Sequence, residues 1–111
     1  MKNFKPYFAV IFTSTLTENT KGYSEMATEM ENLAKEQKGY LGIDSARSDA
    51  STAHSSGVGI TVSYWESLDA IKNWKANSKH LFAQQKGRDQ WYNWYNVRIC
   101  KVEKEYEFEL G

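Results

Sequence analysis

A chain of 111 residues with 41% hydrophobic and 25% charged side chains suits a single soluble domain, residues 1–111, with one hydrophobic core. Its fourteen basic and fourteen acidic side chains balance to a formal net charge of zero, which argues against nucleic-acid binding because such modules carry a basic patch. The single cysteine, Cys100, excludes an internal disulfide, and no Cys/His cluster has the spacing of a zinc site.

The apolar runs of the chain are too short to span a membrane, and the first residues lack the features of a signal peptide. We therefore expect a cytoplasmic protein with no membrane or nucleic-acid partner. Aromatic residues make up 14% of the chain. A core of this size can hide only part of these rings, so we expect the others to line a pocket or an interface.

Three stretches alternate in side-chain character as strands do: residues 7–16, 40–48 and 57–65. Both sides of the first stretch are partly apolar, so we expect it to be covered on both faces. In the third stretch Gly59, Thr61 and Ser63 share one side, and their small size predicts either a close backbone contact or a cavity above them. Residues 49–56 are small and polar and predict a hairpin loop.

Apolar residues at steps of three and four predict a helix that is capped by Asn19 or Thr20 and runs to about Gln37. Gly39 follows, where a left-handed residue is suited to end the helix. These signals predict a surface helix with one face packed on the sheet.

A second helix is predicted to be capped by Ser67, with Asp69 favourably placed in its first turn. Residues 77–78 look like a break, after which an apolar stripe continues to Gly87. The aromatic residues at 91–95 fit either a continued helix or the start of a strand, and periodicity leaves both open.

Residues 96–109 alternate and predict a long last strand, with a bulge near Lys101 where the apolar phase switches. The resulting order, β-α-β-β-α-β, predicts an α+β, ferredoxin-like fold in which two helices cover one face of a four-stranded antiparallel sheet. No element remains to cover the apolar residues of the other face. A second copy is the simplest cover, so we expect a homodimer packed through the open sheet face.

A constellation in the second half of the chain has the form W-x8-W-x5-H-x6-G-R-x2-W-Y, starting at Trp65. It follows the segment GVGITVSYWES (residues 57–67) and precedes NVRICKVEKEYEF (residues 96–108). With these residues the chain resembles, over nearly its whole length, the antibiotic biosynthesis monooxygenase (ABM) family of dimeric α+β barrels, and in particular its small stand-alone bacterial members.

The ABM family includes oxygenases of aromatic polyketides that use no metal or flavin, quinol-type oxygenases, haem-degrading enzymes, and members without demonstrated chemistry. The resemblance implies a monooxygenase that needs no cofactor and acts on a small aromatic or quinone-like molecule. The haem-degrading branch combines an Asn on the first strand, a Trp on the second helix and a His about ten residues later. Trp74 matches that Trp, but Gln84 stands where the His is needed and residues 7–16 contain no Asn. The haem motif is therefore incomplete.

His80 is the candidate catalytic base. If Ser78 caps a second helical piece, His80 lies in its first turn, where the helix dipole disfavours imidazolium and leaves a neutral ring that can accept a proton. A base of this kind would remove an acidic proton from the substrate in a dry pocket. The competing interpretation is a His that hydrogen-bonds between a helix and the sheet edge and stabilises the fold.

Five further side chains are candidates for substrate binding: Trp65, Trp74, Tyr64, Tyr95 and Arg98. The indoles would stack on a planar substrate, and the tyrosines and the arginine would donate hydrogen bonds to its oxyanion. The alternatives are that the tryptophans belong to the core and that the tyrosines and Arg98 lie at the dimer interface. Three functions thus remain: a cofactor-independent monooxygenase, a non-catalytic dimer that binds a small hydrophobic ligand, and a haem-degrading monooxygenase, against which the incomplete motif counts.

Overall fold

The computed structural model of the protein describes residues 4–48, 57–84 and 91–111, and for residues 80–84 it describes the backbone only. The elements occur in the order β1 (Tyr7–Leu16), α1 (Tyr23–Lys35), β2 (Tyr40–Arg47), β3 (Val58–Trp65), α2 (Leu68–Gln84) and β4 (Tyr92–Val102). The strands form one antiparallel sheet in the order β2-β3-β1-β4. The predicted ferredoxin-like β-α-β-β-α-β fold is confirmed.

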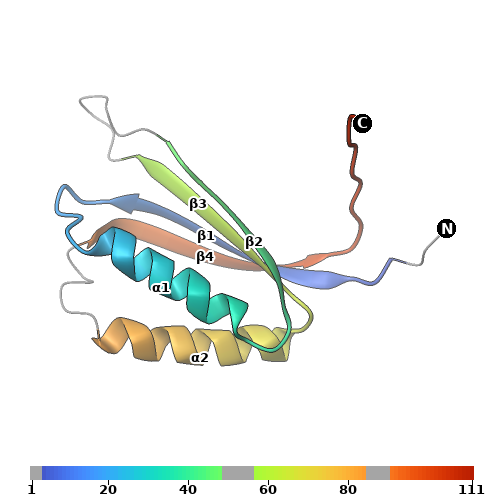
Figure 1. The fold of residues 1–111 in the computed structure, drawn as a ribbon, viewed down its shortest axis with the longest axis horizontal. Helices are drawn as coiled ribbons and strands as arrows, with labels where there is room; N and C mark the ends of the chain where they lie inside the picture. The colour runs from blue at the N-terminus through green and yellow to red at the C-terminus, as the bar shows by residue number, and fades with distance from the viewer. Residues whose placement is uncertain (1–3, 49–56, 85–90) are drawn as a thin grey trace.

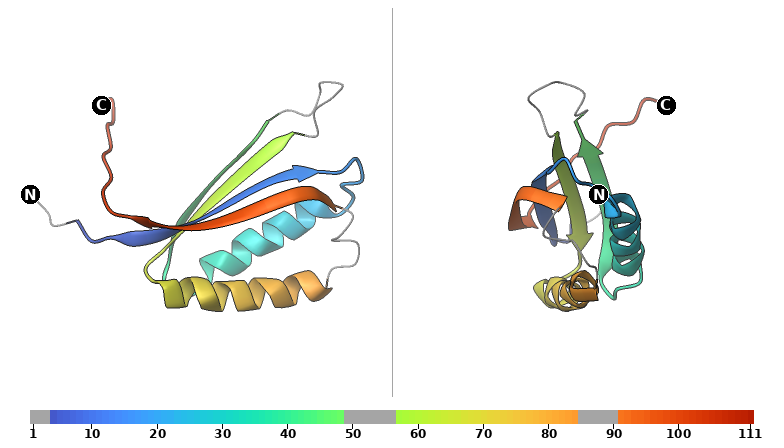
Figure 2. Two further views of the ribbon diagram at one scale, coloured as in Figure 1. Left: turned by 180° about the vertical axis from the view of Figure 1, so that it is seen from behind. Right: turned by 90° about the vertical axis from the view of Figure 1, so that its left-hand side faces the viewer.

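Both helices lie on the same face of the sheet (Figures 1 and 2). Phe8 and Val10 of β1 pack towards the helices, so the residues that alternate with them point to the opposite side. We call these two sides the helix side and the uncovered face. The helices pack over β2, β3 and β1, whereas Val97 and Ile99 on the helix side of β4 are about half exposed. The edge strand β4 is therefore apolar and accessible on this side.

The core lies between α2, the end of α1 and the middle of the sheet. Its buried members are Ala34, Trp65, Ala70 and Ile71. The Trp65 side chain is fully buried, and its Nε1 donates a hydrogen bond of 2.8 Å to Ser63 Oγ. Its ring stacks on Trp74 at 5.7 Å between centroids. Burying a large apolar side chain contributes about 1.5–3 kcal/mol, so Trp65 is a main anchor of the fold.

The starts of the two helices differ from each other. The predicted Ser67 cap of α2 is confirmed, since Ser67 Oγ accepts a hydrogen bond of 3.0 Å from the Ala70 amide. The predicted side-chain cap of α1 by Asn19 or Thr20 is wrong. The helix starts after Gly22, whose φ is +83°, and the Tyr23 amide donates to the backbone carbonyl of Thr20. A left-handed glycine thus takes the place of the polar cap.

The predicted break at residues 77–78 is also wrong, because α2 runs without interruption from Leu68 to Gln84. The Ser78 hydroxyl donates a hydrogen bond of 3.0 Å to the backbone carbonyl of Lys75, which accommodates a serine inside a helix. Asp69 lies in the first turn, as predicted. The expected continuation to Gly87 and the loop at residues 49–56 lie outside the described residues.

The last strand runs from Tyr92 to Val102, so of the two alternatives for the aromatic residues before Asn96 the strand is observed, and the strand ends earlier than predicted. It begins before Asn96 because the end of β1 supplies partners, with Leu16 opposite Tyr92. It ends at Val102 because Val102 pairs with Tyr7, the first residue of β1, and β1 offers no partner beyond it. The bulge expected near Lys101 is instead at the other end of this pair, between Thr15 and Leu16.

The fold also depends on one glycine at the entry to β2. Gly39 has the predicted left-handed backbone, with φ of +89°, and a Cβ there would lie 2.6 Å from that of Ala70. β2 can therefore enter the sheet close against α2. In the part of the chain that the structure describes, none of the helices combines the length and hydropathy that a membrane crossing requires.

Candidate functional site

A cluster of four aromatic side chains lies on the helix side, where α1 and β4 begin. It consists of Phe12, Tyr23, Tyr92 and Tyr95, which we call the aromatic cluster. Phe12 stacks on Tyr95 with centroids 5.4 Å apart and meets Tyr92 edge-on at 5.6 Å. Tyr23 meets Tyr92 edge-on at 5.8 Å. Since the Tyr95 side chain is 58% exposed, the cluster is open to solvent at one side.

Arg47, the last residue of β2, brings a cation to this cluster. Its Nη2 donates hydrogen bonds to Ser14 Oγ at 2.9 Å and to the Tyr23 hydroxyl at 3.3 Å. Its guanidinium carbon lies 5.7 Å from the centroid of the Tyr23 ring, within the range of a cation–π contact. None of the described carboxylates forms an ion pair with Arg47. No described carboxylate therefore offsets the guanidinium charge beside the aromatic rings.

The space predicted above the small residues of β3 is filled by this arginine. Gly59 pairs with Arg47 across the sheet, and a Cβ on Gly59 would overlap the Arg47 guanidinium. Ser14, the other neighbour of Gly59, is almost completely buried beneath the same group. The glycine is thus required by the close approach of a side chain, and neither the predicted backbone contact nor the predicted cavity is found there.

The Tyr92 hydroxyl is held in its neutral form. Burial raises the pKa of Tyr92 above its ordinary value of 10.0, and the hydroxyl of Tyr23 raises that pKa further, while Arg47 acts in the opposite direction. Tyr92 is therefore a hydrogen-bond donor at neutral pH. Together with Arg47 it can stabilise a negative charge that develops on a bound molecule.

The candidate substrate-binding residues are divided between the two faces of the sheet. Trp65, Trp74 and Tyr95 are on the helix side: Trp65 is fully buried in the core, Trp74 stacks on it, and Tyr95 belongs to the aromatic cluster. Tyr64 and Arg98 are on the uncovered face. The structure therefore brings only part of this set together.

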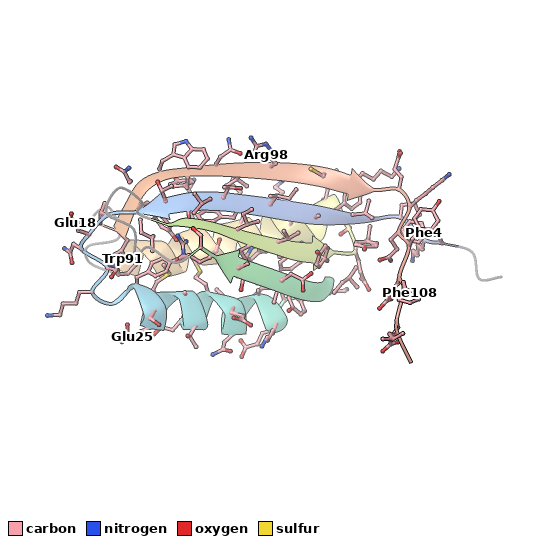
Figure 3. The ribbon with its side chains drawn as sticks, turned by 90° about the horizontal axis from the view of Figure 1, so that it is seen from above. Phe4, Glu18, Glu25, Trp91, Arg98 and Phe108 are labelled. Carbon is pink, nitrogen blue, oxygen red and sulfur yellow. The ribbon has the colours of Figure 1, made fainter. Side chains whose placement is uncertain are left out.

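On the uncovered face, Tyr64 is engaged by its own strand neighbour. Its hydroxyl donates a hydrogen bond of 2.9 Å to Asp44 Oδ2, which is the main reason that the pKa of Tyr64 is raised. Arg98 pairs with Ile11 and is exposed. Figure 3 shows Arg98 on β4, at the outer edge of the sheet. Both side chains are accessible to a molecule that packs on the uncovered face.

The side chain of His80 is outside the described residues, but its backbone position changes one argument. α2 is continuous through Ser78, so His80 lies near the C-terminal end of a helix rather than in a first turn. The helix-dipole argument for a neutral imidazole therefore does not apply. Figure 1 shows the C-terminal end of α2, the start of α1 and the start of β4 at the same end of the domain.

Trp91 lies next to the aromatic cluster and holds it in position. Its ring is buried, its Nε1 donates a hydrogen bond of 2.7 Å to the Lys21 carbonyl, and its backbone carbonyl accepts one of 2.8 Å from the Thr17 amide. It also meets the Tyr23 ring edge-on at 6.0 Å. Trp91 thus fixes α1 against the start of β4. Among the described side chains, the structure contains no group of three or more potential metal ligands.

Sequence reasoning missed Arg47, Tyr23 and Phe12 as members of the site. The available signal was Gly59 in an otherwise apolar strand, which indicated a close approach above it. Identifying Arg47 as the approaching group requires the β2–β3 register, and residues 49–56 between the strands do not determine that register from sequence alone.

One known protein is similar to this chain in sequence, and several solved structures are similar to it in fold. The chain is 46% identical over 104 residues to the uncharacterized protein YqjZ of Bacillus subtilis, covering 94% of this chain and 86% of YqjZ. No protein-family model matches the chain. Its fold is similar to that of SnoaB, a cofactor-independent oxygenase from Streptomyces nogalater, in the crystal structure of a mutant, with a TM-score of 0.70. The two chains are 8% identical, and the match covers 89% of this chain and 95% of the SnoaB chain.

A second similar fold is that of a candidate antibiotic biosynthesis monooxygenase from Bacillus cereus, with a TM-score of 0.65 and 16% identity. The match covers 94% of this chain and all of the other. At these identities the two structures establish a common fold and nothing about a common reaction.

Proposed function

Because the chain belongs to the same family as YqjZ of Bacillus subtilis and has the fold of a cofactor-independent oxygenase, we propose that it is an ABM-type monooxygenase. Its substrate would be a small planar aromatic or quinone-like molecule with an acidic proton. The reaction would need no bound cofactor or metal, since the substrate itself supplies the electrons for O₂.

The observation that carries this proposal is the aromatic cluster with Arg47 beside it. Tyr95 offers an exposed ring that is already stacked on Phe12, so a planar molecule can extend the stack. Arg47 and the neutral hydroxyl of Tyr92 lie next to these rings. A phenolate or enolate placed there would meet a ring surface and hydrogen-bond donors at the same time.

In the proposed reaction a base removes one proton from an activated CH₂ group of the substrate. The resulting carbanion, delocalised onto the ring oxygen, reduces O₂, and a C–O bond forms to give a hydroperoxide. Cleavage of the O–O bond with loss of the second C–H proton yields a carbonyl group and water. One oxygen atom of O₂ enters the product and the other leaves as water, so atoms and electrons balance.

We assign the base to His80, whose helix end lies at the same end of the domain as the aromatic cluster. Trp74 would form the inner wall of the site, supported by the buried Trp65 on which it stacks. Tyr95 and Arg47 would hold the ring and its oxyanion. Tyr64 and Arg98, on the uncovered face, would serve the dimer interface instead.

A non-catalytic ligand-binding protein is the second candidate. It is favoured by the position of His80 late in a continuous helix, which removes the electrostatic reason for a neutral imidazole. Such a protein would use the same rings and Arg47 to bind a planar anion but would leave it unchanged.

Oxygen uptake with an anthrone as the probe distinguishes these two functions. We expect the wild-type protein to consume one O₂ per anthrone and to place one ¹⁸O atom from ¹⁸O₂ in the quinone product. His80→Ala should abolish turnover while the protein still binds the product quinone. Binding without oxygen uptake by the wild-type protein would refute the monooxygenase and support the binding protein.

We also propose that the protein is a cytoplasmic homodimer packed through the uncovered face. Val58, Ile60 and Trp94 are about half exposed on that face, and large apolar side chains gathered on one exposed face are typical of an interaction surface. Light scattering after gel filtration tests this proposal. We expect the mass of two chains for the wild-type protein and of one chain for Ile60→Lys, and a wild-type monomer would contradict it.

A further inference from the structure

A line of apolar side chains follows the edge strand β4 away from the aromatic cluster. Tyr95, Val97 and Ile99 share the helix side of β4, because alternate residues of a strand point to the same side. We call these three residues the β4 strip. They are 58%, 48% and 51% exposed. Figure 2 shows β4 at the edge of the sheet away from α1. The β4 strip is thus a contiguous apolar surface that the domain leaves open, as binding surfaces are.

The β4 strip is continuous with the aromatic cluster, since Tyr95 belongs to both. Val97 is directly opposite Phe12 of the cluster in the register of β1 and β4, and Ile99 is opposite Val10. Phe12 in turn stacks on Tyr95 with centroids 5.4 Å apart. A substituent that points along β4 from a planar molecule stacked on Tyr95 would therefore meet Val97 first and Ile99 next.

The dimensions of the β4 strip fit an extended alkyl chain. Neighbouring strands are about 4.8 Å apart, so a strip on one strand is much narrower than a helix, whose diameter is about 10 Å. From Tyr95 to Ile99 the strand advances by about 13 Å. An extended saturated chain of about ten carbons, with C–C bonds of about 1.5 Å in a zigzag, has the same length. A single alkyl chain therefore matches the strip in width and in length.

A charged residue ends the β4 strip. Lys101 follows Ile99 on the helix side of β4, pairs with Phe8 of β1 and is exposed. The lysine ammonium is strongly hydrated, so an alkyl chain that reached beyond Ile99 would come to a polar surface and would gain little further burial. The strip can therefore bury a chain of limited length only.

We infer that the planar molecule bound at the aromatic cluster carries an alkyl chain of up to about ten carbons, and that Val97 and Ile99 bind this chain. The inference rests on the proposed function and narrows the substrate class to alkyl-substituted aromatic or quinone-like molecules. The proposed homodimer leaves the strip accessible, because its interface is on the opposite side of the sheet.

A series of 2-alkyl-3-hydroxy-1,4-naphthoquinones tests the dependence on chain length. These compounds are planar, are anions at neutral pH and are already oxidised, so their binding can be measured without turnover by the quenching of tryptophan fluorescence. We expect the dissociation constant to fall about 1.5-fold to twofold for each added methylene, because an open strip buries one side of the chain only. From decyl to pentadecyl it should change little. Equal constants for the methyl and decyl compounds would overturn the inference.

A matched pair of variants locates the chain on the strip. In the double variant Val97→Ser, Ile99→Ser the ratio of the dissociation constants of the methyl and decyl compounds should be about tenfold smaller than in the wild type. Leu41→Ser is the control and should keep the wild-type ratio, because Leu41 is as exposed as Val97, at 48%, but lies on β2 at the opposite edge of the sheet. A wild-type ratio in the double variant would place the chain elsewhere and refute the inference.

Photolabelling of the wild-type protein gives an independent test that needs no variant to fold. A diazirine at the end of the decyl chain should label β4 or β1 around Ile99 and Val10, which are paired there. Labels on β2 or on the uncovered face would contradict the inference, because they would show that the chain leaves the cluster in another direction.

These experiments separate the inference from the proposed function. If the wild-type protein binds none of the compounds, the aromatic cluster is not the binding site and both fail. If it binds the methyl compound and gains nothing from a longer chain, the anion site stands and the alkyl strip fails. If the gain is observed but anthrone causes no oxygen uptake, the strip stands and the monooxygenase fails.

Discussion

The close approach of Arg47 to Gly59 predicts a specific dependence between these two positions. Gly59 has a negative φ, so an alanine fits its backbone, but the added Cβ would displace the Arg47 guanidinium. Displacement breaks the hydrogen bond of 2.9 Å to Ser14, whose side chain is buried and would lose its donor.

The magnitude follows from two opposing contributions. A hydrogen bond from a charged donor and the unsatisfied Ser14 hydroxyl together cost about 1–3 kcal/mol, at the lower end because Arg47 can move into solvent. Replacing Gly by Ala at an unstrained position returns about 0.4–1 kcal/mol through the unfolded state. We therefore expect Gly59→Ala to lower the free energy of unfolding by about 0.5–1.5 kcal/mol in the wild-type background.

The same substitution in an Arg47→Ala background should cost nothing or stabilise the protein, because no guanidinium remains to displace. The assay is urea unfolding of all four chains of this double-mutant cycle at one protomer concentration, because the stability of the proposed dimer would depend on concentration. Gly42→Ala is the matched control, because a Cβ there lies 3.7 Å from Tyr64 and makes an ordinary contact. An equal loss on Gly59→Ala in both backgrounds would refute the reasoning.

Three further substitutions test the packing around the site. Trp65→Ala should lower the free energy of unfolding by about 3–5 kcal/mol in a urea titration, because the ring is fully buried and stacked on Trp74; a loss below about 1 kcal/mol would contradict its assignment to the core. Gly39→Ala should cost about 2–4 kcal/mol by the same assay, owing to its φ of +89° and the 2.6 Å approach to Ala70, and an unchanged midpoint would disprove the close packing of β2 on α2. For Tyr92, whose pKa is raised on folding, the folded state retains its proton above pH 10 while the unfolded state loses it, so stability should fall with rising pH there by up to about 1.4 kcal/mol per pH unit. Tyr92→Phe should remove this part of the pH dependence, and an identical alkaline profile for both proteins would show that Tyr92 titrates normally.

The strands and their faces were largely predictable from the sequence, because period-two alternation directly reports which side chains share a face. The first strand was predicted with its observed bounds, Tyr7–Leu16. Alternation also grouped Trp65 with Gly59 on one face. Alternation does not indicate how deeply a side chain is buried, however. Whether Trp65 lies in the core or forms a pocket wall could be decided only from the packing of α2 against it.

The elements that were predicted incorrectly are those that long-range contacts determine. Ser78 has a low helix propensity, yet α2 continues through it: its hydroxyl bonds to the Lys75 carbonyl, and the neighbouring Asn77 amide donates to Gln37 Oε1 beyond the end of α1. The start of β4 depends on its pairing with Leu16 of β1, which local periodicity does not contain. Tertiary context decided both cases.

Only part of the site could be predicted, for the same reason. The sequence indicated Tyr95 because aromatic residues are dense around it, and it indicated space above Gly59. It indicated Arg98 as the cation of the site, whereas the register places Arg98 on the uncovered face and Arg47 beside the aromatic cluster. Alternation along a strand can assign an arginine to one face of the sheet. The residues that lie beside it on that face can be identified only from the pairing of the strands.

The two arginines also provide the most direct test of the central claim, that the aromatic cluster with Arg47 binds a planar aromatic anion. The measurement is a calorimetric titration of anthraquinone-2-carboxylate into the wild type, Arg47→Met and Arg98→Met. The account predicts that Arg47→Met weakens binding about tenfold to a hundredfold, as expected for the loss of a charged hydrogen bond, and that Arg98→Met binds like the wild type. Weaker binding by Arg98→Met, with Arg47→Met unchanged, would place the ligand on the opposite face of the sheet and contradict the account.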